Sequence, residues 1–432
     1  MLDLNFYSKL FDKLLPFPRS ITGDGYRKSL KLLSKYIPFK VYRFRSGKKI
    51  FDWTVPYEWK IKKGVLKNKS GLKLCDYKKN NISVMGYSTN IKKKTKFKIL
   101  KKNIFTIKNS PNLTPYVTSY YKKNWGFCLP YKIFKKIKDQ DILEAEIDSK
   151  FVKGSVDVGV KILKGKSKKT MLIGTYLCHP NMANNELSGP LVMLGLYDFL
   201  SKIKNRRFTY IFLINPETIG SLCFLHKFKN YLNKNIFSGL ILTCLGGNKK
   251  LSYKLTKNND ALIDRLFKNL HQHKLVNLRF FDPTTGSDER QYNSPGFNFP
   301  VGQISKLVYG TYKEYHTDGD NKNLMGIKNI LNSINQLKDI ISIIECAGKI
   351  ERKMPYGEIF LSKHKLYPDT NFNNANFNNR KKKITKQILQ ILSYADGSKD
   401  IVDIANLTNL SVYDFIEPLN ILINKKIVKL KI

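Results

Sequence analysis

The sequence predicts an α/β protein whose mostly parallel sheet is flanked by helices, with a small all-β domain inserted near its start and a winged helix at its end. Three observations support this prediction. From residue 171 onward, short apolar runs alternate with helix-like segments, which is typical of strands buried on both faces of a parallel sheet. Short β-like runs separated by turns fill residues 40–155. Residues 384–432 have the order helix, helix, helix, strand, which indicates a winged helix.

The chain begins with two predicted helices and then changes texture. Residues 3–15 carry apolar side chains at helical spacing and are followed by two prolines, which end a helix. A second helix is expected over residues 26–36. The β-like stretch that follows is rich in aromatic side chains, above all at residues 51–56 and 116–121. We interpret these aromatic residues as core and sheet packing.

The α/β part contains several apolar runs of strand length, each followed by a helical pattern. Ser188 is placed to cap the helix that follows the first of these strands. Asn-rich residues 366–380 indicate a linker. The predicted strands are 171–177, 208–214, 238–244, 277–281 and 300–304, and the predicted helices are 190–204, 220–233, 260–272, 324–348, 384–394, 400–405 and 411–424.

These patterns divide the chain into three domains. Residues 1–39 and 156–370 are expected to form one split α/β domain. Residues 40–155 form the inserted β domain, and residues 381–432 form the winged-helix domain. We expect the helices before residue 38 to pack on the α/β domain, because the change in texture begins only near residue 40.

The composition has an extreme positive balance. The formal net charge of the 432 residues is +44, and Lys supplies nearly all of the excess. Phosphate-reading surfaces usually also employ Arg forks, so we do not expect a nucleic-acid partner. The densest lysine run, residues 92–102, is interpreted as a solvated strand edge. The predicted recognition helix at residues 411–424 offers two acidic residues and little with which to read bases.

Compartment and assembly follow from cysteine usage and hydropathy. The six Cys residues form no CxxC pair, so neither a zinc ribbon nor a disulfide scaffold is expected. We find no signal peptide and no apolar run of membrane-spanning length. A cytoplasmic location is therefore the expectation. A homo-oligomer remains an open alternative to a monomer.

Four polar clusters follow the predicted strands of the α/β part. Two of the chain's six His residues are among them, together with several carboxylates. Each cluster alone fits a structural role, but four together indicate one hydrolytic zinc site, because ligands meet at the carboxyl ends of strands in such sheets. The clusters are His179 with Asn184, Asn185 and Glu186; residues 215–221 (NPETIGS); residues 286–292 (GSDERQY); and residues 314–318 (EYHTD).

Long stretches of the sequence carry a specific resemblance. The chain resembles a bacterial aminopeptidase-like family, which has a zinc-aminopeptidase fold, an inserted small β domain and a C-terminal winged helix. This family is usually encountered beside surface-polysaccharide genes, and its substrate is not settled. The matching stretches span nearly the whole chain: FPRSITGDGYR, FDWTVPYEW, PYVTSYYKKNWGFCL, CHPNMANNELSGP, NPETIGS, GSDERQYNSPG and EYHTDGDN.

The resemblance implies roles for individual residues. His179 matches the first metal-ligand histidine, and His316 matches the last. Glu217 matches the catalytic general base. Asp288 matches an active-site aspartate that orients Glu217 or a ligand.

The sequence also departs from the family pattern. Asn185 stands where the family has a metal-bridging aspartate, and an amide oxygen is a weaker zinc donor than a carboxylate. The neighbouring Glu186 could replace it as a ligand. Thr218 follows the general base where two-zinc relatives have a second glutamate. Arg290 and Tyr292 are candidate contacts for the polar end of the substrate.

Taken together, the residues and the resemblance imply a hydrolase of amide or peptide bonds that uses one zinc ion. Its substrate would be a small peptide or an amide-bearing small molecule of surface-polysaccharide metabolism. Two alternatives remain open. The chain could be a degenerate aminopeptidase-like scaffold without metal, or a winged-helix DNA-binding regulator.

Overall fold

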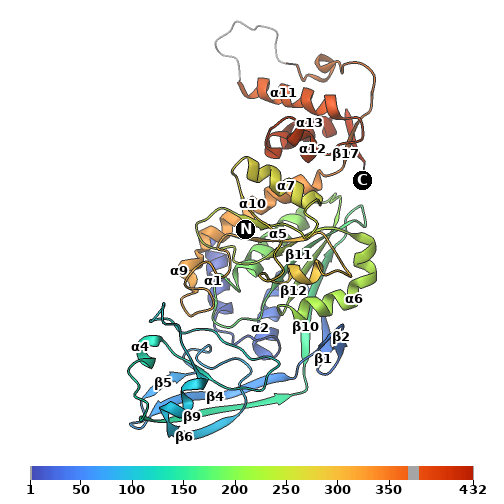
Figure 1. Ribbon diagram of the computed structural model, residues 1–432. Coiled ribbons are helices and arrows are strands. Elements are labelled where there is room, and N and C mark those ends of the chain that lie inside the picture. Colours follow the sequence, from blue (N-terminus) through green and yellow to red (C-terminus); the bar gives the residue numbers. More distant parts are fainter. Residues whose placement is uncertain (1, 368–378, 432) are drawn as a thin grey trace. The chain divides into compact units, whose positions relative to one another are not determined.

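A computed structural model describes residues 2–367 and 379–431 of the chain. These residues form two compact units. The first unit comprises residues 1–257 and 280–335, and the second comprises residues 258–279 and 336–432. Figure 1 shows both units.

The first unit is built on a large mixed sheet with a parallel centre. Strands β12, β11, β13 and β16 run parallel to one another, and their side chains are almost all buried. This explains why each reads as a continuous apolar run in the sequence. β10 and β1 extend one side of the sheet as antiparallel strands, and β14 pairs antiparallel with β16. In this unit the order is β1(Lys40–Arg45)-β10(Ser155–Leu163)-β12(Thr209–Asn215)-β11(Thr170–Tyr176)-β13(Ile236–Leu242)-β16(Val301–Ser305)-β14(Ser252–Lys254).

Two helices connect the central parallel strands. Helix α5 (Ser188–Lys202) leads from β11 to β12, and α6 (Ile219–Asn235) leads from β12 to β13. The two crossovers travel in opposite directions across the sheet, so right-handed connections place these helices on opposite faces (Figure 1). Gly189 lets α5 begin directly on the sheet, because a Cβ there would lie only 2.1 Å from Thr175 Oγ1.

Further helices of this unit complete the layers. The hydroxyl of Tyr26 on α2 donates to the carbonyl of Ile214 on β12 at 3.3 Å, so this N-terminal helix packs on the large sheet. Ile334 on α10 packs against Gly195 on α5, where a Cβ would lie within 3 Å of its side chain. These helices are α1 (Leu4–Leu14), α2 (Asp24–Leu33), α8 (Glu289–Tyr292), α9 (Lys322–Met325) and α10 (Ile327–Glu345), of which the part up to residue 335 belongs to this unit.

A second sheet of the first unit comes from the β-rich part of the chain. It is antiparallel and has the order β5(Lys73–Asp76)-β4(Glu58–Asn68)-β9(Ile142–Val152)-β6(Ile91–Lys96). Strand β6 lies at the edge and carries the lysines of the 92–102 run, so the interpretation as a solvated strand edge is confirmed for its first half. The second half forms the short helices α3 (Phe97–Leu100) and η1 (Lys101–Asn103) instead.

Smaller elements fill the remainder of this region. They are two-stranded pairs and one short helix: β2 (Lys49–Ile50) with β3 (Trp53–Thr54), β7 (Ile104–Phe105) with β8 (Phe127–Cys128), and α4 (Tyr131–Phe134).

The second unit contains the winged-helix part. Its elements are α7 (Leu262–Gln272), β15 (Asn277–Arg279), β17 (Lys349–Arg352), η2 (Leu361–His364), α11 (Asn379–Tyr394), α12 (Ile401–Leu407), η3 (Val412–Phe415), α13 (Ile416–Asn424) and β18 (Val428–Lys431). β17 pairs antiparallel with β18, which completes the wing. Arg265 on α7 forms an ion pair with Asp400 at 2.6 Å, and Asp400 caps the start of α12 by accepting from two backbone N–H groups.

The mixed α/β fold class and the C-terminal winged helix are confirmed, but some details differ from the sequence predictions. The long helix expected over residues 324–348 is broken at Gly326, whose φ of 65° separates α9 from α10. Ser188 lies inside α5 and does not cap it; its hydroxyl bonds the carbonyl of Asn184. Most of the predicted 366–380 linker lies outside the described residues. The three-domain division stays a prediction, and β1 pairs within the large sheet.

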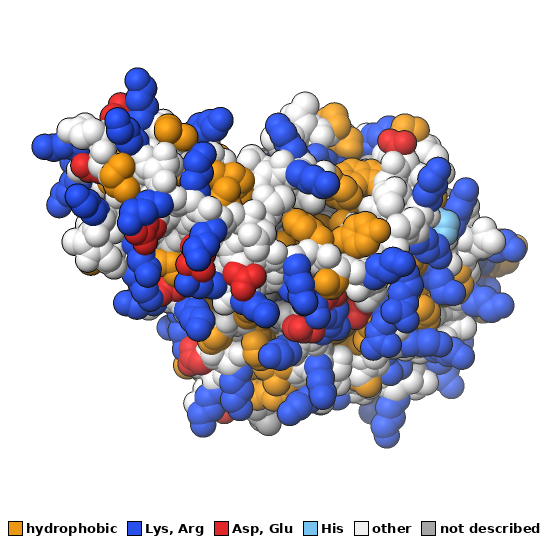
Figure 2. All heavy atoms as spheres, turned by 90° about the horizontal axis from the view of Figure 1, so that it is seen from below, with side chains coloured by type: hydrophobic (Ala, Val, Ile, Leu, Met, Phe, Trp, Pro, Cys, Tyr) orange, Lys and Arg blue, Asp and Glu red, His pale blue; other side chains and the backbone are white. Residues whose placement is uncertain are grey.

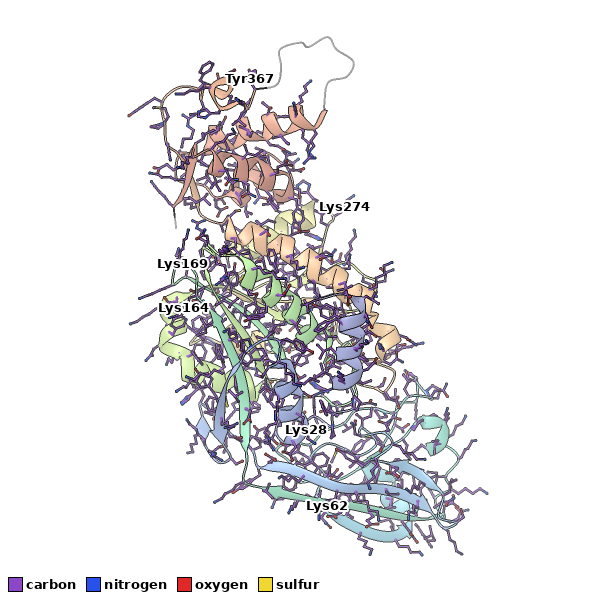
Figure 3. The ribbon with its side chains drawn as sticks, turned by 180° about the vertical axis from the view of Figure 1, so that it is seen from behind. Lys28, Lys62, Lys164, Lys169, Lys274 and Tyr367 are labelled. Carbon is purple, nitrogen blue, oxygen red and sulfur yellow. The ribbon has the colours of Figure 1, made fainter. Side chains whose placement is uncertain are left out.

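The positive charge is spread over many elements. Figure 2 shows Lys and Arg side chains distributed across the face seen from below, between groups of hydrophobic side chains. Lys28 on α2, Lys62 on β4 and Lys164 after β10 are exposed on three separate elements (Figure 3). Across residues 2–367 and 379–431, none of the helices is both long and apolar enough to cross a bilayer.

We expect Asp400→Ala to destabilise the second unit by about 2 kcal/mol at pH 7, because it removes both a helix cap and a partly buried ion pair. Burial raises the pKa of Asp400, but the hydrogen bonds from Arg265 and from the backbone of Asp403, together with the nearby positive charges, outweigh it and hold that pKa below its ordinary value. Ionised Asp400 therefore stabilises the fold above its ordinary pKa, and this contribution is lost as the pH falls through the lowered value. Hydrogen exchange of the α12 amides measures the effect.

The matched control is Glu417→Ala, which removes an exposed partner of Arg380. It should change stability by no more than about 0.5 kcal/mol. An equal effect of the two substitutions would contradict the role of Asp400.

Candidate functional site

His179, the first histidine of the candidate site, lies in the loop after β11. Its Nδ1 donates to Glu186 Oε2 at 2.7 Å, and both side chains are buried. This hydrogen bond fixes the ring and leaves only Nε2 of His179 for another partner. The other oxygen of Glu186, Oε1, has no hydrogen-bond partner among the described residues. Burial works to lower the pKa of His179, whereas Cys178 and Glu186 beside it raise that pKa well above its usual value.

The buried side chain of Arg19 holds the loop that carries His179. Arg19 donates through Nε to the carbonyl of His179 at 3.0 Å and through Nη1 to the carbonyl of Leu14 at 2.6 Å. It is only 2% exposed. A buried guanidinium close to the Glu186 carboxylate compensates the charge of that group. Arg19 therefore positions the backbone of His179 and balances the negative charge of Glu186.

The carboxylate of the site follows β12. Glu217 Oε2 lies 3.6 Å from His179 Nε2, and Oε1 accepts a hydrogen bond from Ser287 Oγ at 2.8 Å. Its side chain is 26% exposed, so it faces solvent while it touches buried groups. Burial raises the pKa of the Glu217 carboxyl. A carboxyl with a raised pKa can both accept and return a proton near neutral pH.

The second histidine comes from the loop between β16 and α9. The ring of His316 lies 5.2 Å from the ring of His179, measured between centroids. Burial, together with the neighbouring His179, lowers the pKa of His316 to about 3. The ring is therefore neutral at physiological pH, which is the form that binds metals.

A tyrosine from the β-rich region contacts both histidines. The ring of Tyr116 lies 5.3 Å from His179 and 5.5 Å from His316. Its backbone N–H donates to the carbonyl of His316 at 2.7 Å. The aromatic stretch 116–121 was predicted to serve only packing, so this placement corrects the prediction for Tyr116. Its ring forms one wall of the histidine pair.

The loop that carries Asn185 is held by one carboxylate. Asp320 is 1% exposed and accepts from the backbone N–H of Asn184 at 2.6 Å and of Asn185 at 2.8 Å. The side-chain oxygen of Asn185 accepts from the Tyr176 hydroxyl at 3.2 Å. Both the backbone and the side-chain oxygen of Asn185 are therefore engaged by protein groups.

Asp288 organises the turn that carries Glu217. It accepts from the backbone N–H of Thr218 at 2.7 Å and from Asn215 Nδ2 at 2.9 Å. Burial, with a further contribution from Glu217, raises the pKa of Asp288 to about 7. Its cluster lies in the segment between β15 and β16 and includes the short helix α8.

The two candidate substrate contacts on α8 differ in exposure. Tyr292 is fully buried in the hydrophobic core, and its hydroxyl has no hydrogen-bond partner among the described residues. Arg290 is partly exposed, and its Nε donates to the carbonyl of Ser287 at 3.3 Å. Tyr292 therefore offers no surface to a substrate, whereas Arg290 is partly open to solvent.

Strained backbone gathers around these residues. Asn181, Thr218, Cys244 and His316 have φ values of 53°, 64°, 51° and 53°. Residues other than glycine adopt this region rarely, and such strain persists where the surrounding structure enforces it, often at functional sites. All four follow strands of the parallel centre, so the strain marks the same edge of the sheet.

Sequence reasoning missed four residues of this neighbourhood: Arg19, Tyr116, Cys244 and Asp320. Cys244 follows β13, and its Sγ lies 3.7 Å from Asn185 Oδ1. The motif FPRSITGDGYR and the stretch EYHTDGDN contained signals for Arg19 and Asp320, but the backbone groups that they bind in the loop after β11 lie 135 or more residues away. Within the described residues, the one compact group of potential ligands is Cys178, His179 and Glu186, whose ligand atoms lie within 4.8 Å of one another.

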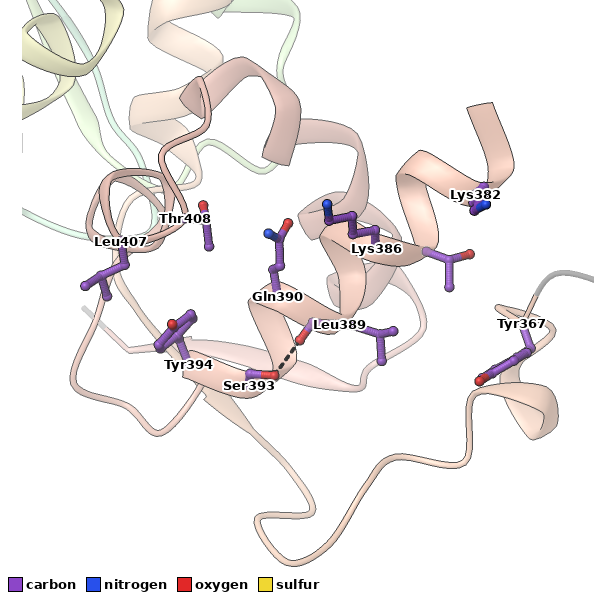
Figure 4. Close-up of a pocket in the computed structure, with 10 residues that line it drawn as sticks. Tyr367, Lys382, Lys386, Leu389, Gln390, Ser393, Tyr394, Leu407 and Thr408 are labelled. Carbon is purple, nitrogen blue, oxygen red and sulfur yellow. Dashed lines mark hydrogen bonds between the residues drawn. The ribbon is translucent and has the colours of Figure 1, made fainter. Parts of the chain in front are cut away.

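A separate hollow lies within the second unit. It has a volume of about 600 Å³ and lies along α11, with Lys386, Gln390 and Tyr394 among its walls (Figure 4). The described residues that line it include no His, Cys or carboxylate side chain. It therefore offers no set of metal ligands or of acid and base groups.

We expect Asp320→Asn to destabilise the chain by about 2–3 kcal/mol, because an amide has one acceptor oxygen for the two buried N–H groups that Asp320 now satisfies. The amides of Asn184 and Asn185 should exchange faster with solvent, as measured by hydrogen exchange. Asp12→Asn, at an exposed pair with Lys322, is the control and should leave these amides unchanged. Unchanged exchange in Asp320→Asn would show that other contacts hold the loop.

Comparison with known proteins identifies the family to which the chain belongs. Residues 8–347 match a family model described as a domain of unknown function (DUF4910), and residues 348–430 match a winged helix-turn-helix model. A protein of Clostridium acetobutylicum, named as a candidate polysaccharide biosynthesis protein with an aminopeptidase-like domain, is 39% identical over 361 residues, which are 83% of this chain and 82% of that protein.

Two solved structures show the fold. A candidate peptidase from Clostridium acetobutylicum is similar with a TM-score of 0.88 and 34% identity, over 99% of this chain and 96% of that chain. BSAP, a zinc aminopeptidase from Bacillus subtilis, is similar with a TM-score of 0.56 and 12% identity, over 77% of this chain and 92% of that chain, which shows the fold alone. The resemblance predicted from the sequence is confirmed: the chain belongs to the DUF4910 family, which here combines an aminopeptidase-like fold with a C-terminal winged helix.

Proposed function

We propose that this chain hydrolyses an amide bond at a single-metal centre built around His179, His316 and Glu217. The observation that carries the proposal is the convergence of the buried imidazole of His179, the partly buried imidazole of His316 and one partly exposed carboxylate at the carboxyl edge of the parallel strands. The name of the Clostridium relative and the aminopeptidase-like fold support the same reaction class.

Two imidazoles can hold one zinc ion, with water in the remaining positions of the metal. His179 Nε2 lies 3.6 Å from Glu217 Oε2, so this carboxylate stands where it can reach a water bound to the ion. Glu186 holds Nδ1 of His179, which is the usual outer partner of a metal-binding imidazole and leaves Nε2 as the ligand atom. We assign His179 and His316 as the protein ligands that would hold the ion.

A zinc ion held there supplies Lewis acidity for the amide carbonyl and lowers the pKa of the attacking water. Glu217 would take the proton of that water and return it to the leaving amine. Ser287 orients this carboxylate through its hydrogen bond to Oε1. Asp288 fixes the turn through the backbone of Thr218, and it is proposed as a positioning residue for Glu217.

The loop at Asn185 argues for one ion and against two. A second divalent ion needs further negative charge, and Asn185 and Thr218 are both neutral. The side-chain oxygen of Asn185 already accepts a hydrogen bond from the Tyr176 hydroxyl, and Glu186 Oε2 already accepts one from His179 Nδ1. In this proposal Asn185 contributes at most a weak ligand, and Glu186 orients His179.

The substrate is proposed to be a small peptide or an amide-bearing sugar intermediate. The sugar alternative follows the name of the Clostridium relative, which refers to polysaccharide biosynthesis. The main alternative is a scaffold protein that has lost catalysis. Asn185 and Thr218 favour this alternative, because they are neutral where two-zinc relatives have carboxylates. The winged helix gives little support to a DNA-binding role. Asp414 and Glu417 lie at the predicted recognition helix and form ion pairs with Lys383 and Arg380, so acidic groups stand where DNA phosphates would approach.

We predict no more than one zinc ion per chain in protein purified without chelator, and loss of that ion in both His179→Ala and His316→Ala. Elemental analysis measures this directly. His226→Ala, at an exposed histidine on α6, should retain the metal of the wild type. Two tightly bound ions, or zinc retained by both site variants, would contradict the single-metal centre.

Glu217→Gln separates catalysis from metal binding. Because Glu217 is proposed to carry a proton, the substitution should lower the rate of amide hydrolysis about 10²- to 10⁴-fold and keep the zinc content. The assay uses dipeptides and N-acylated amino sugars. If the wild type binds zinc and cleaves none of these compounds, the scaffold alternative gains support.

The 185–186 loop gives a graded prediction for zinc affinity. Asn185→Asp adds negative charge beside the proposed ion and should tighten zinc binding about tenfold. Glu186→Gln weakens the partner of His179 Nδ1 and should loosen zinc binding about 10- to 100-fold. Zinc titration of the three proteins decides; unchanged affinity in both variants would remove this loop from the site.

A further inference from the structure

An aromatic cleft lies in the β-rich part of the first unit. It has a volume of about 690 Å³, within the range of small-molecule sites. Its aromatic walls are Tyr57, Tyr87, Tyr120, Tyr121 and Phe151. We refer to the hollow lined by these five residues as the aromatic cleft.

The rings of the cleft combine a fixed floor with exposed walls. Tyr87 is buried at the floor, where its ring contacts Tyr120 at 5.3 Å and Phe151 at 6.0 Å between centroids. Tyr57 and Tyr121 are each 51% exposed, and Phe151 is 40% exposed. Large aromatic faces left open to water around a hollow offer apolar contact area, and the tyrosines add hydroxyl groups at its rim.

Two of these tyrosines are held in a strained backbone. The φ values are 63° at Tyr87 and 27° at Tyr120, in the region that favours glycine. The hydroxyl of Tyr87 is fixed by a hydrogen bond with Thr22 Oγ1 at 2.7 Å. Strain of this kind is retained where a fixed side-chain position is needed.

The cleft has a positive rim. Lys122 and Lys123 line it and are exposed, and the described residues of the lining include no Asp or Glu. No ion pair involves either lysine within the described part of the chain. In Figure 2, Lys and Arg side chains likewise surround groups of hydrophobic side chains on the face seen from below. The aromatic cleft therefore suits a ligand with both an apolar face and a negative charge.

One hydrogen bond joins the cleft to the histidine pair. The hydroxyls of Tyr120 and Tyr116 are 2.8 Å apart, and the ring of Tyr116 contacts both His179 and His316. A wall of the cleft and a wall of the proposed metal centre are therefore neighbouring side chains of one short segment. A ligand seated in the cleft would lie next to the centre.

We infer that the aromatic cleft is a binding site for an acidic saccharide, a sugar that carries a phosphate or a carboxylate. Sugar rings present apolar C–H faces that pack on aromatic rings, and their hydroxyls suit the tyrosine, threonine and asparagine groups of the lining, such as Thr89 and Asn90. Lys122 and Lys123 pair with the anionic group as point charges. The inference rests on the proposed function in one respect: it identifies the sugar-bearing alternative as the substrate class.

Calorimetric titration of the full chain tests the inference with four probes. N-acetylglucosamine 1-phosphate and glucuronic acid represent the phosphate and the carboxylate source of negative charge. N-acetylglucosamine has the sugar ring without the negative charge, and inorganic phosphate has the negative charge without the sugar ring. At least one acidic sugar should bind tenfold or more tightly than either half, and raising NaCl from 50 to 500 mM should weaken that binding because the lysines are exposed.

Matched variants locate the binding. Tyr57→Ala and the double substitution Lys122→Gln/Lys123→Gln should each weaken binding of the acidic sugar about tenfold or more. Their controls are Tyr356→Ala, at an 85% exposed tyrosine of the second unit, and Lys92→Gln/Lys93→Gln on the edge strand β6, which makes the same charge change. The controls should bind like the wild type. Both cleft positions are exposed, so melting temperatures should be unchanged.

The outcome separates this inference from the proposed function. His179→Ala should lose zinc and keep binding of the acidic sugar, because the cleft does not contain that residue. Zinc-dependent hydrolysis without acidic-sugar binding would overturn the cleft assignment and leave the metal centre standing. Sugar binding equal for charged and neutral probes, binding unaffected by the cleft variants, or binding of phenylalanine-containing dipeptides in place of the sugars would overturn it as well.

Discussion

The carboxylate of Asp320 ties together the two chain segments that build the site. It binds the backbone N–H groups of Asn184 and Asn185 from the loop after β11, and it lies four residues after His316. The same short segment is anchored on its other side, where Asp318 accepts from the backbone of Thr114 at 2.9 Å and from Asn80 at 3.0 Å. Charged acceptors that are buried and shared by several N–H groups hold loops firmly, because releasing them leaves unpaired polar groups.

This arrangement gives the β-rich region a part in the site. The loop that carries Tyr116 is paired with the His316 segment by a backbone bridge between Pro115 and Thr317. The aromatic ring then contacts both histidines, and its hydroxyl is linked to Tyr120. A region that looks in sequence like an independent small β domain thus supplies a wall of the candidate centre. Changes in this region can alter the site without touching the large sheet.

The electrostatics of the site differ from those of the surface. The exposed lysines are spread over many elements, whereas the candidate centre is a compact group of buried carboxylates balanced by imidazoles and by Arg19. Burial raises the pKa values of Glu217 and Asp288 and lowers that of His316. All three shifts favour the neutral forms of these groups, which is the expected result of desolvation. The large net charge therefore says little about the chemistry of the centre.

The positions of the strand ends could be predicted from the sequence. The strand expected over residues 171–177 is Thr170–Tyr176, and the strand expected over 208–214 is Thr209–Asn215. Buried parallel strands are apolar throughout, so their limits are visible in local composition. His179 and Glu217 follow these ends directly, and the ends of neighbouring parallel strands meet at one edge of the sheet. The sequence alone therefore predicted that His179 and Glu217 meet at one edge of the sheet, where their side chains lie 3.6 Å apart.

The tertiary structure decided which groups surround that centre. The positive φ of His316 and the partners of Asp320, Arg19 and Tyr116 have no local signature. Asp320 and Asn185 are 135 residues apart, and Arg19 reaches across 160 residues to the carbonyl of His179. Hydrogen bonds over such separations depend on the path of the whole chain, whereas hydrophobic periodicity reports only on neighbours within one helix or strand. For this reason the sequence determined where the histidines and carboxylates lie, and only the folded chain determined how they are held.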